Sequence, residues 1–327
     1  MAIDWPRFAS IIRAHSRYVL VSHIRPDADA LGSELGMAGV LEALGKHVRI
    51  VNGQATPPNL RFLDPHNKIK VIGIDVQPAE LSDAEVLMVL DTSAWAQLGP
   101  MGDVIRSTRA RKIVLDHHVS NDELGAEPFK DTTAEATGRL VVQAAHQLDV
   151  ALTPEIATPL FAALATDTGW YRFASTSGGT YRCAAELVEA GAKPPEIYKA
   201  LYERDSLARL KLIGRTLAKT ETELDGRLIH TNIVRADFEA TGAIPSDTED
   251  IINTTLQVGG TEVAVIFVEL PSAAVKVSFR SRGALDCNQV ASGFGGGGHK
   301  AAAGATIPGT VADVQGKVLD AVRAAMR

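Results

Sequence analysis

Residues 18–29 read YVLVSHIRPDAD, a short apolar run that passes directly into one histidine and two aspartates. A short run rich in Val and Leu is typical of a buried strand. Ligands of open α/β sheets bind just beyond the carboxyl ends of such strands. The stretch therefore predicts an α/β fold and a site that contains His23, Asp27 and Asp29. The alternative is an Asx-type turn in which the aspartates only cap the next helix.

The first half of the chain repeats this alternation of strands and helices. Runs rich in Val, Ile and Leu predict further strands at 47–51, 85–90 and 112–115. Apolar residues at helical spacing predict helices over 30–44, 133–148 and 154–166. Strands that alternate with helices indicate βαβ units and a parallel sheet.

The second half has a different pattern. The prolines and charged residues of 192–205 are typical of a helical connector. After it, strands are predicted at 228–234, 262–270 and 274–280, with a glycine loop at 295–298 and helices over 286–294 and 311–326. We therefore predict a parallel-sheet α/β domain over 1–191, a helical linker over 192–215 and a smaller α+β domain over 216–327.

Composition agrees with a globular protein of two domains. The chain has 327 residues, of which 46% are hydrophobic and 22% charged, which excludes a disordered chain. A net charge of −6 excludes a global basic field for a long duplex, but a local pocket for a short phosphorylated ligand fits. Cys183 and Cys287 form no CxxC pattern, so neither a disulfide framework nor a thiolate metal site is expected. With no secretory signal and no membrane-length apolar run, we expect a cytoplasmic protein without membrane contact.

Carboxylates and histidines follow three more of the predicted elements: Asp91, the run Asp116-His117-His118, and Asp167. A single aspartate after a strand is usually a cap or turn residue. Two adjacent histidines, taken alone, are more often surface or satisfied core residues. Four such ends in one fold would repel one another as a carboxylate cluster unless cations compensated their charge.

Together these ends supply six candidate metal ligands and no thiolate: His23, Asp27, Asp29, Asp91, His117 and Asp167. Mixed imidazole and carboxylate sets suit transition metals, whereas an all-oxygen set would favour Mg²⁺ or Ca²⁺. We expect two divalent ions, with Mn²⁺ favoured and Co²⁺, Fe²⁺ or Mg²⁺ as alternatives. Two ions can stabilise the attacking and leaving oxygens of a phosphoryl displacement. The residues therefore predict metal-assisted phosphoester hydrolysis.

These motifs, taken together, resemble those of a known family. HIRPDADALGS, VLDTS, DHHVSN and ATDTGWYRF resemble, in order, the four motifs of the DHH phosphoesterases. The tail SFRSRGALDCNQVASGFGGGGHKAAAGA is similar to the DHH-associated domain of type one. The combination resembles the nanoRNase/pAp phosphatase branch over nearly the whole chain. One departure is Ala28, where many relatives carry glycine, and a methyl group there should not disturb metal binding.

The resemblance implies roles for individual residues. It implies two metal ions that share Asp91, one also held by His23 and Asp27, the other by Asp29, His117 and Asp167. It implies catalytic roles for His118, which would face the scissile phosphate, and for Asp116, which would orient a ligand from behind.

The tail contains cations and glycines suited to a phosphorylated substrate. Lys276, Arg280 and Arg282 lie between 273 and 283 without an acidic residue, and the arginine fork suits phosphate oxygens. A four-glycine loop alone is more often a flexible turn, but bare backbone N–H groups also allow close approach of phosphate. The resemblance implies that the substrate is held by Arg280, Ser281, Asn288, Gly297 and His299.

The expected function is hydrolysis of short oligoribonucleotides (nanoRNA) to 5′-mononucleotides, and of 3′-phosphoadenosine 5′-phosphate (pAp) to AMP. A catalytic domain facing an end-binding clamp favours substrates of a few nucleotides. The alternatives are a phosphodiesterase dedicated to linear or cyclic dinucleotides such as pApA, a non-catalytic nucleotide sensor, and an inorganic pyrophosphatase. Because dimers are common among related proteins, a homodimer is a further expectation.

Overall fold

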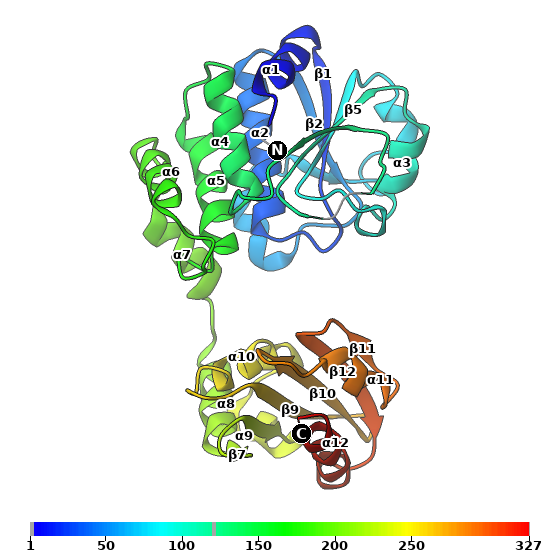
Figure 1. The fold of residues 1–327 in the computed structure, drawn as a ribbon, viewed down its shortest axis with the longest axis vertical. Helices are drawn as coiled ribbons and strands as arrows, with labels where there is room; N and C mark the ends of the chain where they lie inside the picture. The colour runs from blue at the N-terminus through cyan, green and yellow to red at the C-terminus, as the bar shows by residue number, and fades with distance from the viewer. Residues whose placement is uncertain (1–2, 120–121, 327) are drawn as a thin grey trace. The chain divides into compact units, whose positions relative to one another are not determined.

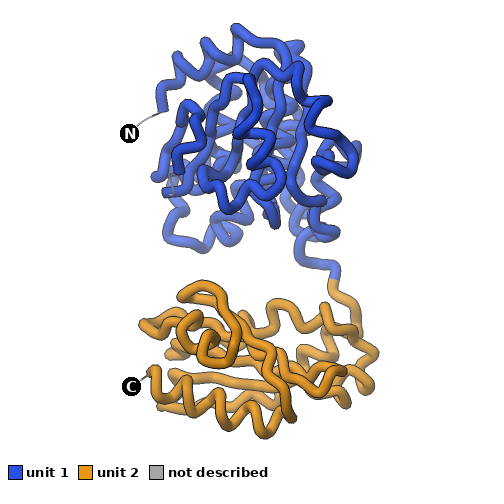
Figure 2. Tube along the Cα trace, turned by 90° about the vertical axis from the view of Figure 1, so that its right-hand side faces the viewer, with its two compact units in different colours: residues 1–204 blue, residues 205–327 orange. Residues whose placement is uncertain are grey.

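The structure is a computed structural model that describes residues 3–119 and 122–326. It divides into two compact units at the peptide bond between Arg204 and Asp205 (Figure 2). Each unit has its own sheet and its own hydrophobic core.

Within its described residues, the first unit contains a six-stranded parallel sheet with the order β3-β2-β1-β4-β5-β6 (Figure 1). Its strands are β1 (Arg17–Val21), β2 (His47–Asn52), β3 (Ile69–Val71), β4 (Val86–Leu90), β5 (Arg111–Asp116) and β6 (Glu127–Lys130). The predicted parallel sheet is confirmed. The sequence analysis missed β3 and β6, because edge strands of three and four residues carry no long apolar run. The direction of winding reverses between β1 and β4, which is where such sheets bind ligands.

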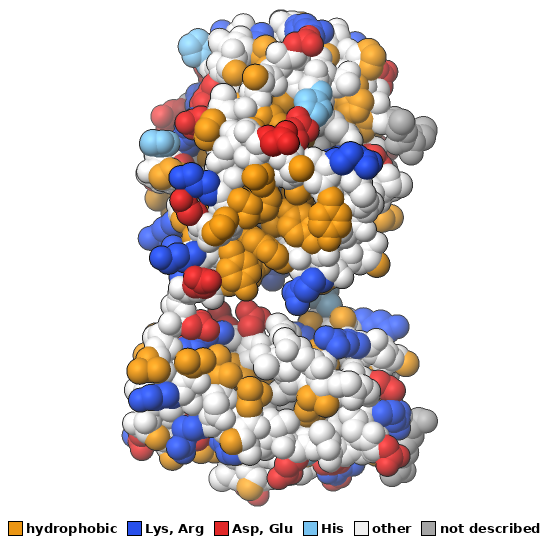
Figure 3. Space-filling view, turned by 90° about the vertical axis from the view of Figure 1, so that its left-hand side faces the viewer, with side chains coloured by type: hydrophobic (Ala, Val, Ile, Leu, Met, Phe, Trp, Pro, Cys, Tyr) orange, Lys and Arg blue, Asp and Glu red, His pale blue; other side chains and the backbone are white. Residues whose placement is uncertain are grey.

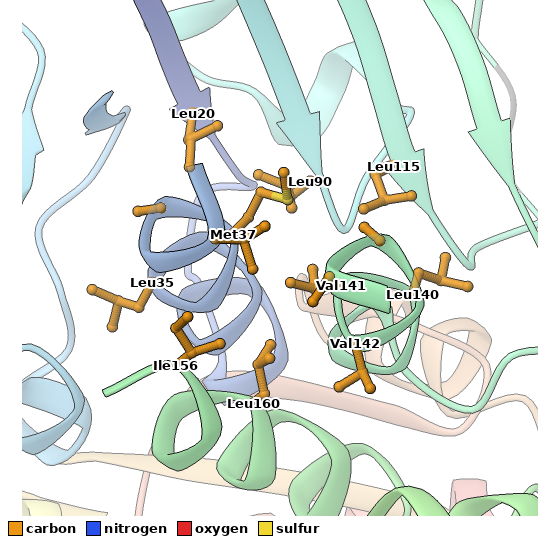
Figure 4. Close-up of a cluster of buried hydrophobic side chains, with 14 of the residues drawn as sticks. Leu20, Leu35, Met37, Leu90, Leu115, Leu140, Val141, Val142, Ile156 and Leu160 are labelled. Carbon is orange, nitrogen blue, oxygen red and sulfur yellow. The ribbon is translucent and has the colours of Figure 1, made fainter. Parts of the chain in front are cut away.

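Helices cover both faces of this sheet. They are α1 (Trp5–Ala14), α2 (Ala28–Ala43), α3 (Met101–Ser107), α4 (Thr137–Gln147), α5 (Pro154–Asp167), α6 (Gly178–Glu189) and α7 (Pro194–Tyr202), with 3₁₀ turns at Pro58–Leu63, Pro78–Leu81 and Trp95–Gln97. Successive strand side chains point to opposite faces. Leu20, Leu90 and Leu115 therefore pack on one face with Met37 of α2 and Leu140 of α4 (Figure 4). The intervening strand residues pack against α3 on the other face.

Three glycines let α2 lie directly against α5. A Cβ on Gly32 would lie 2.3 Å from the carbonyl oxygen of Pro159, and one on Gly36 would lie 2.4 Å from Leu160. Gly39 makes the same kind of approach to Ile156, with 2.6 Å to its side chain. Helix α2 is buried on almost every side as a result. This close packing brings the N-terminus of α2 near the C-terminus of α5.

The second unit, described as far as residue 326, has a six-stranded mixed sheet with the order β11-β12-β10-β9-β8-β7. Its strands are β7 (Glu221–Glu223), β8 (Leu228–Ile233), β9 (Val263–Leu270), β10 (Ala274–Ser281), β11 (Gly297–Gly298) and β12 (Ala302–Pro308). Its helices are α8 (Leu207–Ala218), α9 (Arg235–Thr241), α10 (Ile251–Thr255), α11 (Cys287–Ser292) and α12 (Val311–Ala325), with a 3₁₀ turn at Pro245–Thr248. The smaller α+β unit is confirmed, although part of the predicted glycine loop pairs with β12 as β11.

The range 192–215, predicted as a linker, spans the boundary between the two units. Helix α7 contacts α5 in the first unit, whereas α8 contacts α9 and β8 in the second. Among the described residues, no helix combines the length and apolarity that a bilayer crossing requires.

Candidate metal centre

The centre begins where β1 ends. His23 follows this strand, and Asp27 is the N-cap of α2, with its Oδ1 accepting hydrogen bonds from the backbone N–H groups of Asp29 and Ala30 at 3.0 Å each. The capping interpretation is therefore correct for Asp27, and the cap places α2 two residues earlier than predicted, at Ala28. Capping does not exclude the site, because His23 Nε2 lies 3.9 Å from the same carboxylate.

Asp91 lies between two histidines. Its Oδ2 is 3.5 Å from His23 Nε2, and its Oδ1 is 3.5 Å from His117 Nε2. The residue follows β4, next to the reversal point of the sheet, and its backbone is left-handed with φ 61°. Aspartate tolerates this conformation better than most residues, and strained backbone of this kind is concentrated at functional sites. The geometry fits a carboxylate shared by two ions.

His117 is surrounded by three carboxylates. Its Nε2 lies 3.5 Å from Asp167 Oδ2 and 3.7 Å from Asp29 Oδ2, in addition to the contact with Asp91. Asp29 is in the first turn of α2 and Asp167 is the last residue of α5, so the close packing of these helices brings them together.

Backbone carbonyls orient both histidines. His23 Nδ1 is 3.0 Å from the carbonyl oxygen of Ile24, and His117 Nδ1 is 3.1 Å from that of Ala134. A carbonyl can only accept a hydrogen bond, so Nδ1 carries the proton in both rings. Nε2 is left with a free lone pair that points at the carboxylates, which is the tautomer of a metal-ligating histidine.

Burial and mutual repulsion both act on the carboxylates of this cluster. Burial, together with the charges of Asp29 and Asp27, raises the pKa of Asp91 well above its usual value. Burial and the charge of Asp29 also raise the pKa of Asp167 to about 6. Crowded, buried carboxylates are costly unless a cation is present. The donor set therefore fits divalent ions, and the ligand atoms fall into groups within 4.8 Å, two of which are His23/Asp27/Asp91 and Asp29/His117/Asp167.

His118 is held differently from His117. Asp116 Oδ1 accepts hydrogen bonds from the backbone N–H and from Nδ1 of His118, at 3.0 and 2.9 Å. Although His118 Nδ1 also lies 3.6 Å from Asp91, the bond to Asp116 leaves Nε2 as its free nitrogen. This hydrogen bond raises the pKa of His118 above its usual value. The side chain of His118 is 45% exposed and can meet a substrate.

Asp116 is in turn saturated with donors. Its Oδ2 accepts a hydrogen bond from Ser93 Oγ at 2.7 Å and lies 3.0 Å from Lys130 Nζ. Burial alone would raise the pKa of Asp116, but the hydrogen bonds from His118, Ser93 and Lys130 outweigh it and lower the pKa to about 2. Asp116 is therefore a permanent carboxylate that fixes the ring of His118.

With this geometry in view, comparison with known proteins identifies the family. Residues 17–164 match the model of the DHH family N-terminal domain, and residues 230–327 match that of the DHHA1 domain. A protein of Thermus thermophilus named bifunctional oligoribonuclease and PAP phosphatase NrnA is 35% identical over 307 residues, which cover 93% of this chain and 88% of that protein. The chain belongs to the DHH family.

Two further comparisons agree with this family assignment. A protein of the same name from Bacillus subtilis is 27% identical over 303 residues, covering 91% of this chain and 92% of that protein. A crystal structure of an exopolyphosphatase-related protein from Bacteroides fragilis superimposes with a TM-score of 0.83 and 25% identity, covering 98% of this chain and 94% of the other. Of the DHH-family motifs, only Ser120 and Asn121 of DHHVSN fall outside the described residues.

The expected clamp residues of this DHH-family chain lie on β10, on α11 and in the glycine segment of the second unit. Asn288 Oδ1 accepts a hydrogen bond from the backbone N–H of Gly298 at 2.9 Å, which ties α11 to the glycine segment. His299 follows this segment and is exposed, and Ser281 ends β10. Arg280, together with Lys276 and Ser278 on the same face of β10, lines a cavity of about 200 Å³.

The sequence analysis missed the residues that hydrogen-bond to the candidate ligands. Thr137 Oγ1 donates to Asp91 Oδ1 at 2.9 Å, and the backbone N–H groups of Thr137 and Gly138 donate to Asp29 at 2.8 and 2.9 Å. A helix over 133–148 was predicted, but α4 begins at Thr137, so its N-terminal N–H groups face a carboxylate. A correct helix start would have revealed them. Ser93 lies in the quoted VLDTS motif but was given no role, and Lys130 has no comparable signal because β6 was not predicted.

Proposed function

We propose that this DHH-family chain is a two-metal phosphoesterase that hydrolyses short oligoribonucleotides to 5′-mononucleotides and pAp to AMP. The observation that carries the proposal is the position of Asp91, whose two carboxylate oxygens face two different histidines with free Nε2 atoms. Relatives that match over about nine-tenths of the chain are named as oligoribonucleases and PAP phosphatases, which supports the choice of substrates.

One ion would be held by His23, Asp27 and Asp91, and a second by Asp29, Asp91, His117 and Asp167. We propose Mn²⁺, because mixed imidazole and carboxylate sets suit this ion. When bound, the two ions would supply electrostatic stabilisation of the phosphate oxygens and a lowered pKa for water. Hydrogen bonds from Thr137 and Gly138 keep Asp29 and Asp91 in place for this purpose.

We assign His118 to the scissile phosphate and Asp116 to the positioning of His118. Asp116 accepts a hydrogen bond from Nδ1, so Nε2 of His118 is the atom that would face a phosphate oxygen. The raised pKa of His118 favours a proton on this atom, which then donates to the developing negative charge.

We assign substrate binding to Arg280, Ser281, Asn288, Gly297 and His299 of the second unit. Arg280 offers a planar guanidinium that matches two phosphate oxygens. Gly297 and Gly298 have exposed backbone without side chains, which lets phosphate approach closely.

The test is product analysis in Mn²⁺, with and without a chelator, on pAp, pApA, pyrophosphate and a long single-stranded RNA. We expect chelator-sensitive release of AMP from pAp and pApA, with the long RNA degraded slowly. Rapid loss of the long RNA would make the chain a general exonuclease, and turnover of pApA without pAp would make it a dinucleotide phosphodiesterase. Hydrolysis of pyrophosphate would indicate a pyrophosphatase, and binding of pAp without hydrolysis a sensor.

A further inference from the structure

A surface rich in aromatic side chains lies on the first unit, beside the C-terminal end of α5. We call it the aromatic surface, and it consists of Trp170, Tyr171, Phe173, Tyr181, Tyr198 and Tyr202. Figure 3, which looks at the side of α6 and α7, shows hydrophobic side chains gathered there. Tyr181 and Phe173 are 57% and 55% exposed, which is unusual for rings of this size. Contiguous exposed patches of this kind mark binding sites.

Five of the six rings, all except that of Phe173, contact one another. Tyr171 and Tyr181 stack with centroids 5.5 Å apart and planes at 22°. Trp170 contacts Tyr198 at 5.0 Å and Phe161 of the core at 6.2 Å. Since Tyr171 covers one face of the Tyr181 ring and Tyr181 is still largely exposed, its other face is open for a further planar group.

The aromatic surface begins at Trp170, three residues after the candidate ligand Asp167. Asp167 is followed by a tight turn in which Gly169, Trp170 and Tyr171 all have left-handed backbones, with φ of 56°, 58° and 64°. A Cβ on Gly169 would lie 2.4 Å from the ring of Phe173, so this ring is seated on the turn. A planar group on Phe173 would therefore lie beside the turn that directly follows the proposed metal ligand Asp167.

The charge of this segment suits a polyanion. Residues 168–185, which carry four of the six rings, include Arg172 and Arg182 and no acidic residue, in a chain of net charge −6. Helix α7, which carries Tyr198 and Tyr202, has one residue of each charge, Glu196 and Lys199. Arg172 is fixed by a hydrogen bond from Nε to the carbonyl oxygen of Gly169 at 2.7 Å. Open ring faces interleaved with cations are the arrangement by which proteins bind single-stranded nucleic acid.

We propose that the aromatic surface stacks the nucleobase that follows the scissile phosphate in an oligoribonucleotide. The inference rests on the proposed function and deepens it. A pAp molecule has one base and a terminal 3′-phosphate, so it has no group to place there, whereas pApA and longer RNAs have a second base. The surface therefore distinguishes oligonucleotides from pAp, and it tolerates any base because every base has a π-face.

The test compares pAp and pApA in steady-state kinetics of the full chain. Phe173→Leu and Tyr181→Leu keep apolar volume but remove the ring face. Phe173→Tyr keeps an aromatic ring at the same position. We expect each leucine variant to lower the ratio of kcat/KM for pApA to that for pAp by about tenfold. Phe173→Tyr should leave this ratio as it is in the unmodified chain. Ile74→Ser, which removes another exposed apolar side chain of the first unit, is the matched control.

An unchanged ratio in both leucine variants would overturn the proposal. The alternative occupant of the aromatic surface is a second copy of the chain, which light scattering on the same proteins tests. Loss of a dimer in the leucine variants, with the kinetic ratio unchanged, would identify the surface as a contact between two copies. If the unmodified chain hydrolyses neither substrate, the proposed function fails. Equilibrium binding of pApA to the same variants still decides the inference, since equal affinities would refute it.

Discussion

Asp116 holds His118 at two points, because a single oxygen, Oδ1, accepts both its backbone N–H at 3.0 Å and its Nδ1 at 2.9 Å. The adjacent His117 has no such bond and turns its Nε2 to three other carboxylates. The two neighbouring histidines thus have different partners, because Asp116 bonds to His118 and leaves His117 to face the carboxylate cluster.

Replacement of Asp116 by asparagine should impair catalysis more than metal binding. The amide of Asp116→Asn would present N–H groups to Ser93 and Lys130, which are themselves donors to this position. We expect kcat to fall by about 10- to 100-fold, as for other residues that support a metal site from behind. The measurement is kcat on pAp together with metal content, and an unchanged kcat would contradict the positioning role.

Loss of Asp91 should abolish turnover. Asp91→Ala removes the carboxylate that faces both His23 and His117, so neither ion would keep its full ligand set. We expect kcat to fall by on the order of a thousandfold or more, and the bound metal to decrease. Asp103→Ala, at a highly exposed aspartate of α3, should leave both quantities unchanged. Near-native activity of Asp91→Ala would refute the shared-ligand assignment.

Arg280→Ala should weaken substrate binding more than turnover. A lost charged hydrogen bond costs about 1.5–3 kcal/mol, so KM for pAp should rise by about tenfold or more. Lys317→Ala on α12 removes another exposed cation from the second unit and serves as the control. A large fall in kcat with constant KM would place Arg280 at the reacting phosphate instead.

Glu34 should make stability depend on pH. It is fully buried on α2, where Asn52 Nδ2 donates to its Oε2 at 2.9 Å and Asn52 Oδ1 accepts from the backbone N–H of Ser22. Burial outweighs the hydrogen bond from Asn52 and raises the pKa of Glu34 from 4.5 to about 8. The folded state therefore keeps this proton when the unfolded chain has lost it, so the contribution to stability is complete at low pH and declines as pH rises from about 4.5 to 8.

Glu34→Gln cannot ionise and keeps a hydrogen-bond acceptor for Asn52. Relative to the unmodified chain, its free energy of unfolding should increase with pH across this window, by at most about 1.4 kcal/mol per unit. Urea unfolding of the metal-free proteins at several pH values measures the difference. Parallel curves for the two proteins would show that Glu34 is ionised in the folded state.

The contact between α2 and α5 should tolerate no side chain at Gly32. A methyl group there would meet the carbonyl oxygen of Pro159 at 2.3 Å, and overpacking of this kind costs about 1–3 kcal/mol. Gly214→Ala, at an open position of α8, should instead stabilise the chain by about 0.5–1 kcal/mol. Thermal unfolding of Gly32→Ala and Gly214→Ala measures the two changes in stability. Equal changes would contradict the close packing of α2 against α5.

The predictable part of this protein is local. Apolar runs predicted β1, β2, β4 and β5. The polar residues that follow β1, β4 and β5 gave five of the six candidate ligands, because a strand and the turn that follows it are encoded in consecutive residues. The sixth, Asp167, ends helix α5. The short edge strands were not predicted. Strand β6, for example, ends at Lys130 and includes Pro128, and proline is atypical of a strand interior.

The sequence by itself determined the family and the α/β organisation with two sheets, and it supplied the candidate ligand residues that we propose. Tertiary structure alone decided that Asp91 faces two histidines, that α4 begins at Thr137 against Asp29, and that Lys130 and Ser93 meet Asp116. These contacts join residues up to 108 positions apart. They depend on strand order and on the glycine-lined approach of α2 to α5, which no local periodicity encodes.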